Sequence, residues 1–250
     1  MSTSSRRVAL VTGSSRGLGS VIARRLAEDG FAVAVNGLHE DAHAAEVVRA
    51  IGDAGSAEVF LADITDEQQV AQLVAGVTER LGAIDVLVVN ATGPQPEGPL
   101  VEVAWEDHLA QLDFFVKSPV LLGRAVIPGM RARRYGRIVQ IDSEVADQPP
   151  PGRSAYATAK NAQIGLTRAW ARELAPSGIT VNTVAPGFIP VERHADVPAE
   201  TRRAYLASVP VGRIGDPQDV ACAVSSFASE AAGFITGQRI LVDGGRSLGS

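Results

Sequence analysis

The chain has 250 residues, 46% of them hydrophobic and 20% charged, so it is long enough to bury a large core. A net charge of −5 and a pI near 5.4 argue against nucleic acid as a partner. A single cysteine excludes an internal disulfide, and the histidines at positions 39, 43, 108 and 194 form no zinc-type cluster, so we predict no metal site.

Targeting signals are not evident in the sequence. The opening MSTSSRR lacks the apolar region of a secretory signal, and no later window is apolar for long enough to span a bilayer. We therefore expect a cytoplasmic protein with no membrane partner. We also expect Cys222 to lie in a helix core.

Short runs rich in Val and Ile alternate with longer helical patterns along the chain. The runs predict seven buried strands, at residues 8–12, 32–36, 58–62, 85–90, 137–141, 179–184 and 239–243. Segment 66–82 shows the helical pattern well, since one face carries Val70, Leu73, Val74, Val77 and Leu81, and Gly82 is a plausible stop. Buried strands that alternate with helices predict an α/β fold with a doubly wound parallel sheet and helices on both faces.

No repeat, low-complexity tract or linker interrupts this pattern, so we expect a single domain over residues 1–250. Two long irregular segments stand out, at residues 147–153 and 186–200. Ligands of parallel sheets bind in loops at the carboxyl ends of the strands, and these segments are candidates for such loops.

The first predicted strand runs into the glycine-rich turn TGSSRGLG, residues 12–19, directly before a helical segment. Gly13 permits the tight turn, Gly17 lets the backbone approach a diphosphate, and Gly19 permits close packing of the helix. The positive end of the helix favours the negative charge of a phosphate. Such a turn is a weak signal alone, but strand before and helix after make nucleotide binding several times likelier than a purely structural turn.

The stretch SAYATAK, residues 154–160, places Tyr156 one helical turn before Lys160. Residues four apart on a helix are neighbours, and such pairs usually lie on the protein surface, so the spacing alone does not assign this pair a catalytic role.

Taken together, six motifs resemble the short-chain dehydrogenase/reductase family over essentially the whole chain. They are TGSSRGLG, NATG at 90–93, a serine at 143, YATAK at 156–160, NTVAPG at 182–187 and VDGG at 242–245. The nearest resemblance is to the 3-oxoacyl-(acyl carrier protein) reductase type. It implies a Rossmann fold, and it implies that the pair at 156 and 160 is catalytic.

In the mechanism that the resemblance implies, Tyr156 exchanges a proton with the substrate oxygen and Ser143 hydrogen-bonds that oxygen. Lys160 lowers the pKa of Tyr156 and holds the nicotinamide ribose, because a nearby cation favours the phenolate. The alternative is that Ser143 has a purely structural role and caps backbone groups at the end of a strand. The resemblance also implies a set of cofactor contacts: Gly13, Ser15, Arg16, Gly17, Leu18, Gly19, Asn36, His39, Asp63, Ile64, Asn90, Ala91, Tyr156, Lys160, Pro186, Gly187 and Ile189.

The first departure from the family is Phe115, which stands where the family has an asparagine whose carbonyl holds a water near the lysine. Because Pro119 has no N–H to give to the carbonyl four residues before it, we hypothesise that the Phe115 carbonyl stays free for that water. In a rival hypothesis, the carboxylate of Asp113 pairs with Lys160. The third possibility is that no water is held near Lys160, so that the proton relay is lost and turnover is slow or absent.

Two further departures concern the substrate end. Val191 stands where the family commonly has a threonine for the nicotinamide carboxamide, which leaves backbone contacts from Phe188 and Ile189 to orient the ring. Glu144 and Asp147 follow the serine. We interpret them as solvated loop residues; the alternative is that they favour a substrate with hydroxyls or a cationic group.

NADP(H) is the preferred cofactor in this interpretation, with NAD(H) as the alternative. An acid at the end of the second strand would bind the ribose of NAD, but Gly37 stands near that position and no acid appears before Glu40. Arg16, Asn36 and His39 are candidates to receive a 2′-phosphate.

The substrate is a carbonyl compound or alcohol, either free or carrier-bound. A carrier protein is acidic and needs basic residues near the site, for which the segment RARRYGR supplies Arg131, Arg133, Arg134 and Arg137. The position of a second arginine of the family is Ser177 here, so the sequence leaves open a free small ketone, a secondary-metabolite ketone or a carrier-bound fatty acyl chain. Arginines at the C-terminal end of a helix also interact favourably with the helix dipole, which would explain the cluster without any partner protein.

Two classes of function stay open. The leading one is an NADP-dependent carbonyl reductase or alcohol dehydrogenase, and the other is a nucleotide-binding protein of weak or no redox activity, which only Phe115 and Val191 favour. The resemblance further suggests a homotetramer, with the helical segments 105–133 and 154–175 at its interfaces.

Overall fold

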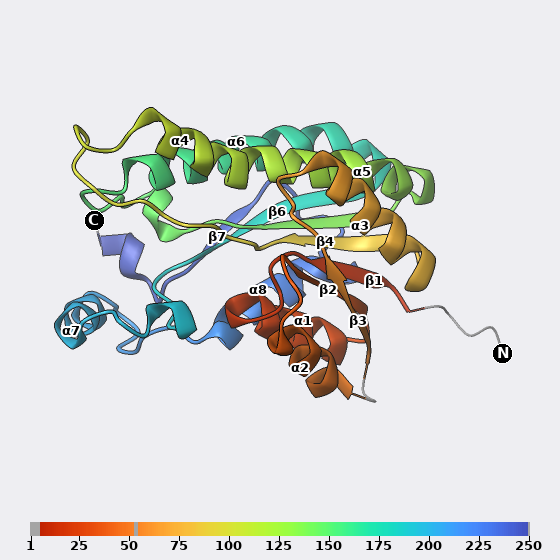
Figure 1. Cartoon of the computed structure of the whole chain (residues 1–250), viewed down its shortest axis with the longest axis horizontal. Coiled ribbons are helices and arrows are strands. Elements are labelled where there is room, and N and C mark those ends of the chain that lie inside the picture. The colour runs from red at the N-terminus through yellow and green to blue at the C-terminus, as the bar shows by residue number, and fades with distance from the viewer. Residues whose placement is uncertain (1–5, 53–54, 250) are drawn as a thin grey trace.

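A seven-stranded parallel sheet forms the centre of the computed structural model, which describes residues 6–52 and 55–249 (Figure 1). The strand order is β3-β2-β1-β4-β5-β6-β7, and every neighbouring pair is parallel. All seven predicted strands are confirmed, as β1 (Val8–Val11), β2 (Ala32–Gly37), β3 (Ser56–Leu61), β4 (Ile84–Val89), β5 (Gly136–Ile141), β6 (Ile179–Pro186) and β7 (Arg239–Val242).

Helices cover both faces of this sheet (Figure 1). One face carries α1 (Gly17–Glu28), α2 (Ala42–Ile51) and α8 (Pro217–Ala228), and the other carries α3 (Glu67–Arg80), α4 (Trp105–Leu112), α5 (Ser118–Arg133) and α6 (Ser154–Leu174). The short helix α7 (Ala199–Ala207) projects beyond the carboxyl ends of the strands. The predicted doubly wound α/β fold is therefore confirmed.

Alternation along the strands divides the core into two layers, because successive side chains of a strand point to opposite faces. In β1, Val8 and Leu10 join the cluster under α3, α5 and α6, whereas Ala9 and Val11 join the cluster under α1, α2 and α8. Both faces of β1 are thus buried, as its uninterrupted apolar run predicts.

The segment 66–82 forms α3 as its pattern predicts. The Asp66 side chain caps the helix by accepting the Gln69 N–H at 2.8 Å, and Gly82 ends it with a φ of +110°. Val70, Leu73 and Val77 are buried.

The expectation for Cys222 is wrong. It lies on α8, but its side chain is exposed, because the buried face of that helix is formed by Val220, Ala221 and Val224. Among the described residues, no helix is long and apolar enough to cross a membrane, and no group of three or more acidic, histidine or cysteine side chains is placed to hold a metal ion.

Between α4 and α5, residues Asp113–Lys117 form one π-helical turn, which ends two residues before Pro119. The Ser118 N–H donates to the Asp113 carbonyl, and the Ser118 hydroxyl donates to the Phe114 carbonyl at 2.6 Å. A proline has no N–H and its ring crowds the preceding turn, so a widened turn here accommodates it.

Candidate active site

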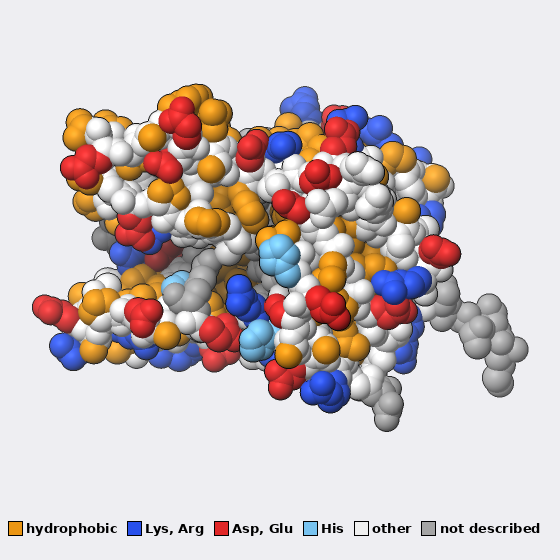
Figure 2. All heavy atoms as spheres, in the orientation of Figure 1, with side chains coloured by type: hydrophobic (Ala, Val, Ile, Leu, Met, Phe, Trp, Pro, Cys, Tyr) orange, Lys and Arg blue, Asp and Glu red, His pale blue; other side chains and the backbone are white. Residues whose placement is uncertain are grey.

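A cavity of about 1150 Å³ opens at the carboxyl ends of the strands. It lies where the strand order reverses between β1 and β4, the position at which open α/β sheets bind ligands. The space-filling view shows the hollow between the α4 side of the molecule and the α7 side (Figure 2). All seventeen cofactor contacts implied by the resemblance line this cavity, and so does Ser143.

Backbone geometry explains the glycine-rich turn at one end of the cavity. Gly13 and Gly17 have φ values of +60° and +57°, a backbone region that residues other than glycine rarely adopt. A Cβ on Gly19 would overlap the Gly13 carbonyl oxygen and lie 2.5 Å from the Asn90 amide nitrogen. The turn is therefore tightly packed against the end of β4.

Asn90 fastens this turn from the neighbouring strand. Its side-chain amide donates to the Thr12 carbonyl at 2.9 Å and to the Gly13 carbonyl at 3.1 Å, and the Thr12 hydroxyl accepts the backbone N–H groups of Asn90 and Ala91. These contacts tie the ends of β1 and β4 together.

The amino terminus of α1 borders the cavity, because Gly17, Leu18 and Gly19 line it. Asp side chains cap α2, α3 and α8, but α1 begins after Arg16 with no side-chain cap and no acid in its first turn. The first N–H groups of a helix need a partner, and a phosphate fits that need and the helix dipole. Together with the glycine conformations, this is a cradle that fits a dinucleotide.

At the adenosine end, the side chains differ in how available they are. Arg16 and His39 are exposed and line the cavity. Asn36 is buried, and its amide is already bonded to the Gly13 N–H and to the carbonyls of Phe60 and Ala62. Its side chain thus joins β2 to the glycine turn and β3, which leaves Arg16 and His39 as the better candidates for a 2′-phosphate.

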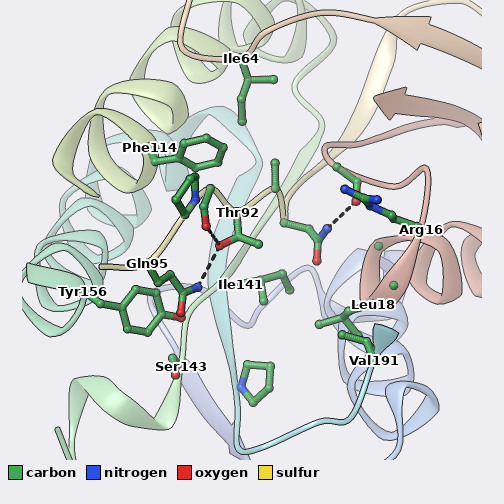
Figure 3. A pocket seen from close by; sticks show the side chains of 18 of the residues that line it. Arg16, Leu18, Ile64, Thr92, Gln95, Phe114, Ile141, Ser143, Tyr156 and Val191 are labelled. Carbon is green, nitrogen blue, oxygen red and sulfur yellow. Dashed lines mark hydrogen bonds between the residues drawn. The ribbon is translucent and has the colours of Figure 1, made fainter. Parts of the chain in front are cut away.

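Asp63 and Ile64 follow β3 and border the same end. The Asp63 carboxylate accepts the N–H and hydroxyl of Thr65 at 2.8 and 2.7 Å, which fixes its orientation. Figure 3 shows Ile64 and Arg16 well separated from Tyr156 and Ser143, so the cavity has two distinct ends.

Tyr156 and Lys160 lie one turn apart on α6 and are both buried, at 7% and 3% exposure. The Lys160 ammonium donates to the Ile141 carbonyl at 2.7 Å and to the Gln163 side chain at 3.2 Å. It lies 5.7 Å from the centroid of the Tyr156 ring. This pair is therefore not exposed on the protein surface but forms part of the cavity wall.

Ser143 follows β5 and lies on the Tyr156 side of the cavity (Figure 3). Its hydroxyl oxygen accepts the Val145 N–H at 3.2 Å, so Ser143 does cap the backbone after β5, as the purely structural alternative predicts. Because that contact uses the oxygen as an acceptor, the hydroxyl proton can still be donated to a substrate oxygen.

The Phe115 ring lies between the π-helical turn and the Tyr156–Lys160 pair. It is buried, packs edge-on against Tyr156 with centroids 5.4 Å apart, and lies 3.9 Å from the Lys160 ammonium. The free Phe115 carbonyl and the pairing of Asp113 with Lys160 stay predictions. Sequence reasoning considered only the backbone of Phe115 and missed the ring contact.

The interpretation of Glu144 as a solvated residue is wrong. Glu144 is buried; its carboxylate accepts from the Tyr205 hydroxyl and from the Arg246 guanidinium, each at 3.1 Å. Burial raises the pKa of Glu144, and Arg246 partly opposes that rise. The Tyr205 hydroxyl also accepts the Phe188 N–H at 2.7 Å, which links α7 to the loop after β6.

Asp147 is half-exposed but paired, since it accepts from Arg239 at 2.6 Å. The same guanidinium donates to Asp142 at 2.5 Å and to the Ser143 carbonyl at 2.9 Å. Asp142 is buried, and burial raises the pKa of its carboxyl group against the effects of Lys160 and Arg239. Sequence reasoning missed Tyr205, Arg239 and Arg246 because they are 60 to 100 residues away from these partners along the chain.

The predicted basic cluster does not lie at the cavity mouth of this protomer. α5 runs antiparallel to the strands, so its last turn, with Arg131 and Arg133, lies near the beginning of β5. This is the end of the sheet opposite the cavity, which opens at the carboxyl ends of the strands. Arg131 pairs with Glu173, and Arg137 is buried with its guanidinium stacked on Tyr135. These contacts give the cluster a structural role.

Comparison with known proteins agrees with this geometry. Residues 13–247 match the family model described as enoyl-(acyl carrier protein) reductase. The 3-oxoacyl-(acyl-carrier-protein) reductase FabG of Vibrio cholerae is 38% identical, with 96% of each chain covered. The cis-4-hydroxycyclohexanecarboxylate dehydrogenase of Sinomonas cyclohexanicum is also 38% identical, again with 96% of each covered. Among solved structures, the gluconate 5-dehydrogenase of Burkholderia cenocepacia in complex with NADP and tartrate has a TM-score of 0.91 at 33% identity, covering 98% of this chain and 96% of that one.

Proposed function

This chain belongs to the short-chain dehydrogenase/reductase family, and we propose that it is an NADP(H)-dependent enzyme that transfers a hydride between the nicotinamide and a carbonyl or secondary alcohol. One observation carries the proposal: Ser143, Tyr156 and Lys160 line the same cavity as the glycine-rich turn. A dinucleotide that extends from that turn reaches the catalytic end. The whole chain, residues 1–250, forms one domain in this proposal.

The three catalytic residues divide the work of proton transfer. When bound, the nicotinamide supplies the hydride chemistry. Tyr156 donates its proton to the substrate oxygen in reduction and removes it in oxidation. Lys160 favours the phenolate by its charge and so lowers the pKa of Tyr156, and Ser143 donates a hydrogen bond that fixes the substrate oxygen.

NADP(H) is the proposed cofactor because no acid follows β2 before Glu40, and the neighbouring glycine-rich turn supplies the guanidinium of Arg16. Arg16 and His39 are exposed at that end, and Gly37 holds the position from which an acid would repel a 2′-phosphate. The solved gluconate 5-dehydrogenase with bound NADP supports the same choice.

A free, small substrate suits this site better than a carrier-bound one. The basic cluster lies at the amino ends of the strands, where Arg131 pairs with Glu173 and Arg133 donates to the Ile84 carbonyl. It therefore offers no basic surface for an acidic carrier beside the cavity. Relatives named for a hydroxycyclohexanecarboxylate and for gluconate act on small hydroxy acids. The carrier-bound acyl chain of the reductase relatives is the other outcome of the test below.

A homotetramer is the proposed assembly, with α4, α5 and α6 at its interfaces. Trp105 and Leu109 expose 63% and 42% of their surfaces on α4, and a helix that presents large apolar side chains is a typical interface element. Sedimentation at several concentrations measures the assembly directly. The cytoplasm is the proposed location.

Activity with a panel of carbonyl compounds tests the function. Wild-type protein and Tyr156→Phe are first titrated with NADPH and NADH, and the absorbance of the reduced cofactor is then followed with small keto acids, cyclic ketones and a 3-oxoacyl thioester. We expect tighter binding of NADPH, turnover of at least one ketone, and a loss of about 100-fold or more in kcat for Tyr156→Phe with cofactor binding retained. Equal turnover of the two proteins would contradict the assignment of Tyr156.

A further inference from the structure

We propose that Phe115 is a positioning residue of this active site: the face of its ring holds the Lys160 ammonium in place, and its packing orients the Tyr156 ring. The inference rests on the proposed function, and it gives a role to the side chain at the position where the family has an asparagine. The lysine then has a direct contact with an aromatic ring from the position at which the resemblance implies a carbonyl that holds a water.

The geometry around Lys160 leads to this inference. The ammonium nitrogen lies 3.9 Å from the Phe115 ring centroid, which is close for a cation over an aromatic face. The ring itself is only 2% exposed, so the contact is shielded from water. It also meets the Tyr156 ring edge-on at 77°, a favourable arrangement for two aromatic rings.

The backbone explains why the ring reaches this position. Phe115 is the middle residue of the π-helical turn Asp113–Lys117, which precedes Pro119. A π-helical turn rotates its side chains relative to a regular helix, and such turns are frequent at functional sites. The local sequence thus directs an apolar ring at the catalytic pair.

A buried ammonium needs such contacts. Lys160 is 3% exposed, and burial disfavours its charged form. The groups that oppose this effect come from several elements: the Ile141 carbonyl at the end of β5, Gln163 on the same helix, and the Phe115 ring.

The charged and titratable groups near Lys160 include Tyr156 on α6 and Asp142 after β5, whose partner Arg239 comes from β7. Asp113, in the π-helical turn, lines the same cavity. The negative charge of Asp142 favours the ammonium, and Arg239 reduces that effect. The Phe115 ring adds an attraction that carries no proton of its own. Loss of the ring therefore shifts the titration of Lys160 without adding a titrating group.

Nuclear magnetic resonance of labelled lysine tests the inference directly, because the chain has only two lysines, Lys117 and Lys160. Protein labelled with ¹³C at the lysine side chains is titrated with pH as wild type, Phe115→Leu and Phe115→Tyr. We expect Phe115→Leu to lower the midpoint of Lys160 by about one pH unit, and Phe115→Tyr to keep it within about 0.3 unit. Lys117 is exposed and serves as the internal reference.

The same variants are compared by the pH profile of kcat/KM for alcohol oxidation. A weaker charge on Lys160 raises the pKa of Tyr156, so the acidic limb of the profile moves to higher pH in Phe115→Leu by about the same shift. A ring that only fills space would lower the thermal midpoint and leave both titrations unchanged, and that result would overturn the inference.

Two further variants keep the test decisive. Phe115→Met is the second variant without a ring, in case leucine does not fold, and the same downward shift is expected. Phe115→Asn restores the amide of the family; we expect slower turnover than wild type, and faster turnover would overturn the inference. If the wild type itself turns over no substrate, the proposed function fails, while the lysine titration still decides the role of the ring.

Discussion

The two ends of the cavity are held together by different kinds of interaction. The cofactor end consists of a glycine-rich turn, uncharged amides and backbone bonds, with Asn36 and Asn90 joining the ends of the four strands β1 to β4. The substrate end depends on charged side chains from distant segments, with Arg239 bonded to Asp142 and Arg246 bonded to Glu144. The first end is fixed by steric fit and by hydrogen bonds between uncharged groups, whereas the second depends on ion pairs. The two ends should therefore fail in different ways when they are changed.

Removal of Arg239 is expected to have the largest effect on stability. Its guanidinium is the ion-pair partner of Asp142, whose side chain is fully buried, so Arg239→Met leaves a carboxylate without its cation. Breaking a buried pair by removing one partner costs about 3–5 kcal/mol. Denaturant unfolding, followed by tryptophan fluorescence at one fixed protein concentration, measures the loss.

The double variant Arg239→Met, Asp142→Asn is the matched control for this prediction. It replaces the stranded carboxylate by a neutral amide, so we expect it to recover most of the lost free energy of unfolding. A double variant as unstable as the single one would show that the guanidinium acts through packing and not through charge.

At the cofactor end, the corresponding change is Gly19→Ala. The added Cβ would overlap the Gly13 carbonyl and lie 2.9 Å from the Ser14 Cα, so the turn must shift. We expect the dissociation constant for NADPH to rise by roughly 100-fold, about 2.7 kcal/mol, with far less effect on the unfolding of the protein. Cofactor fluorescence measures the binding.

Gly165→Ala is the control for that steric argument. Gly165 lies within α6, and a Cβ there meets no atom within 4 Å. Alanine favours the helix, so binding should be unchanged and stability equal or slightly higher. Weaker NADPH binding in this control would mean that the effect of Gly19→Ala is not local.

This difference also explains what could be predicted from the sequence. The seven strands and the cofactor turn are local patterns in which residue type and spacing carry the information. The Tyr156–Lys160 pair was singled out only by the resemblance of six motifs taken together. The buried state of Glu144 could not be predicted, because its partners Tyr205 and Arg246 lie on α7 and near the end of the chain. Only the folded chain brings such partners together. The Phe115 ring was missed because a helical pattern does not reveal a π-helical turn.

A smaller effect is expected for Tyr205→Phe, which tests the hydrogen bonds of the substrate end without removing a charge. The variant loses the hydroxyl that joins Glu144 to the Phe188 N–H but keeps the ring, whose centroid is 5.5 Å from that of Phe188. Leaving a buried donor unpaired costs about 1–3 kcal/mol, so we expect a rise of roughly tenfold in substrate KM with kcat changed less than about threefold.

Tyr135→Phe is the matched control for this variant. Its hydroxyl accepts from Arg7 at 2.9 Å, beside the first strand and away from the cavity. We expect KM to be unchanged. A fall in kcat for Tyr205→Phe with KM unchanged would instead place Tyr205 in the chemical step.

The smallest effect, and the most specific one, is the order in which the three tyrosines ionise. Burial raises the pKa of Tyr205 to about 12, and the carboxylate of Glu144 adds to the rise, so its hydroxyl stays protonated and keeps its hydrogen bonds. Burial also raises the pKa of Tyr135. Tyr156 lies beside the Lys160 ammonium, which favours its phenolate, and it should therefore ionise first.

Phenolate absorbance measured against pH separates these steps. Tyr156→Phe should remove the earliest step, and Tyr205→Phe should remove the step near pH 12. An earliest step that persists in Tyr156→Phe would contradict the role of Lys160. Because the two steps come from tyrosines that both serve the substrate end, their separation would show how one region keeps a structural hydroxyl protonated while it prepares a catalytic one to lose its proton.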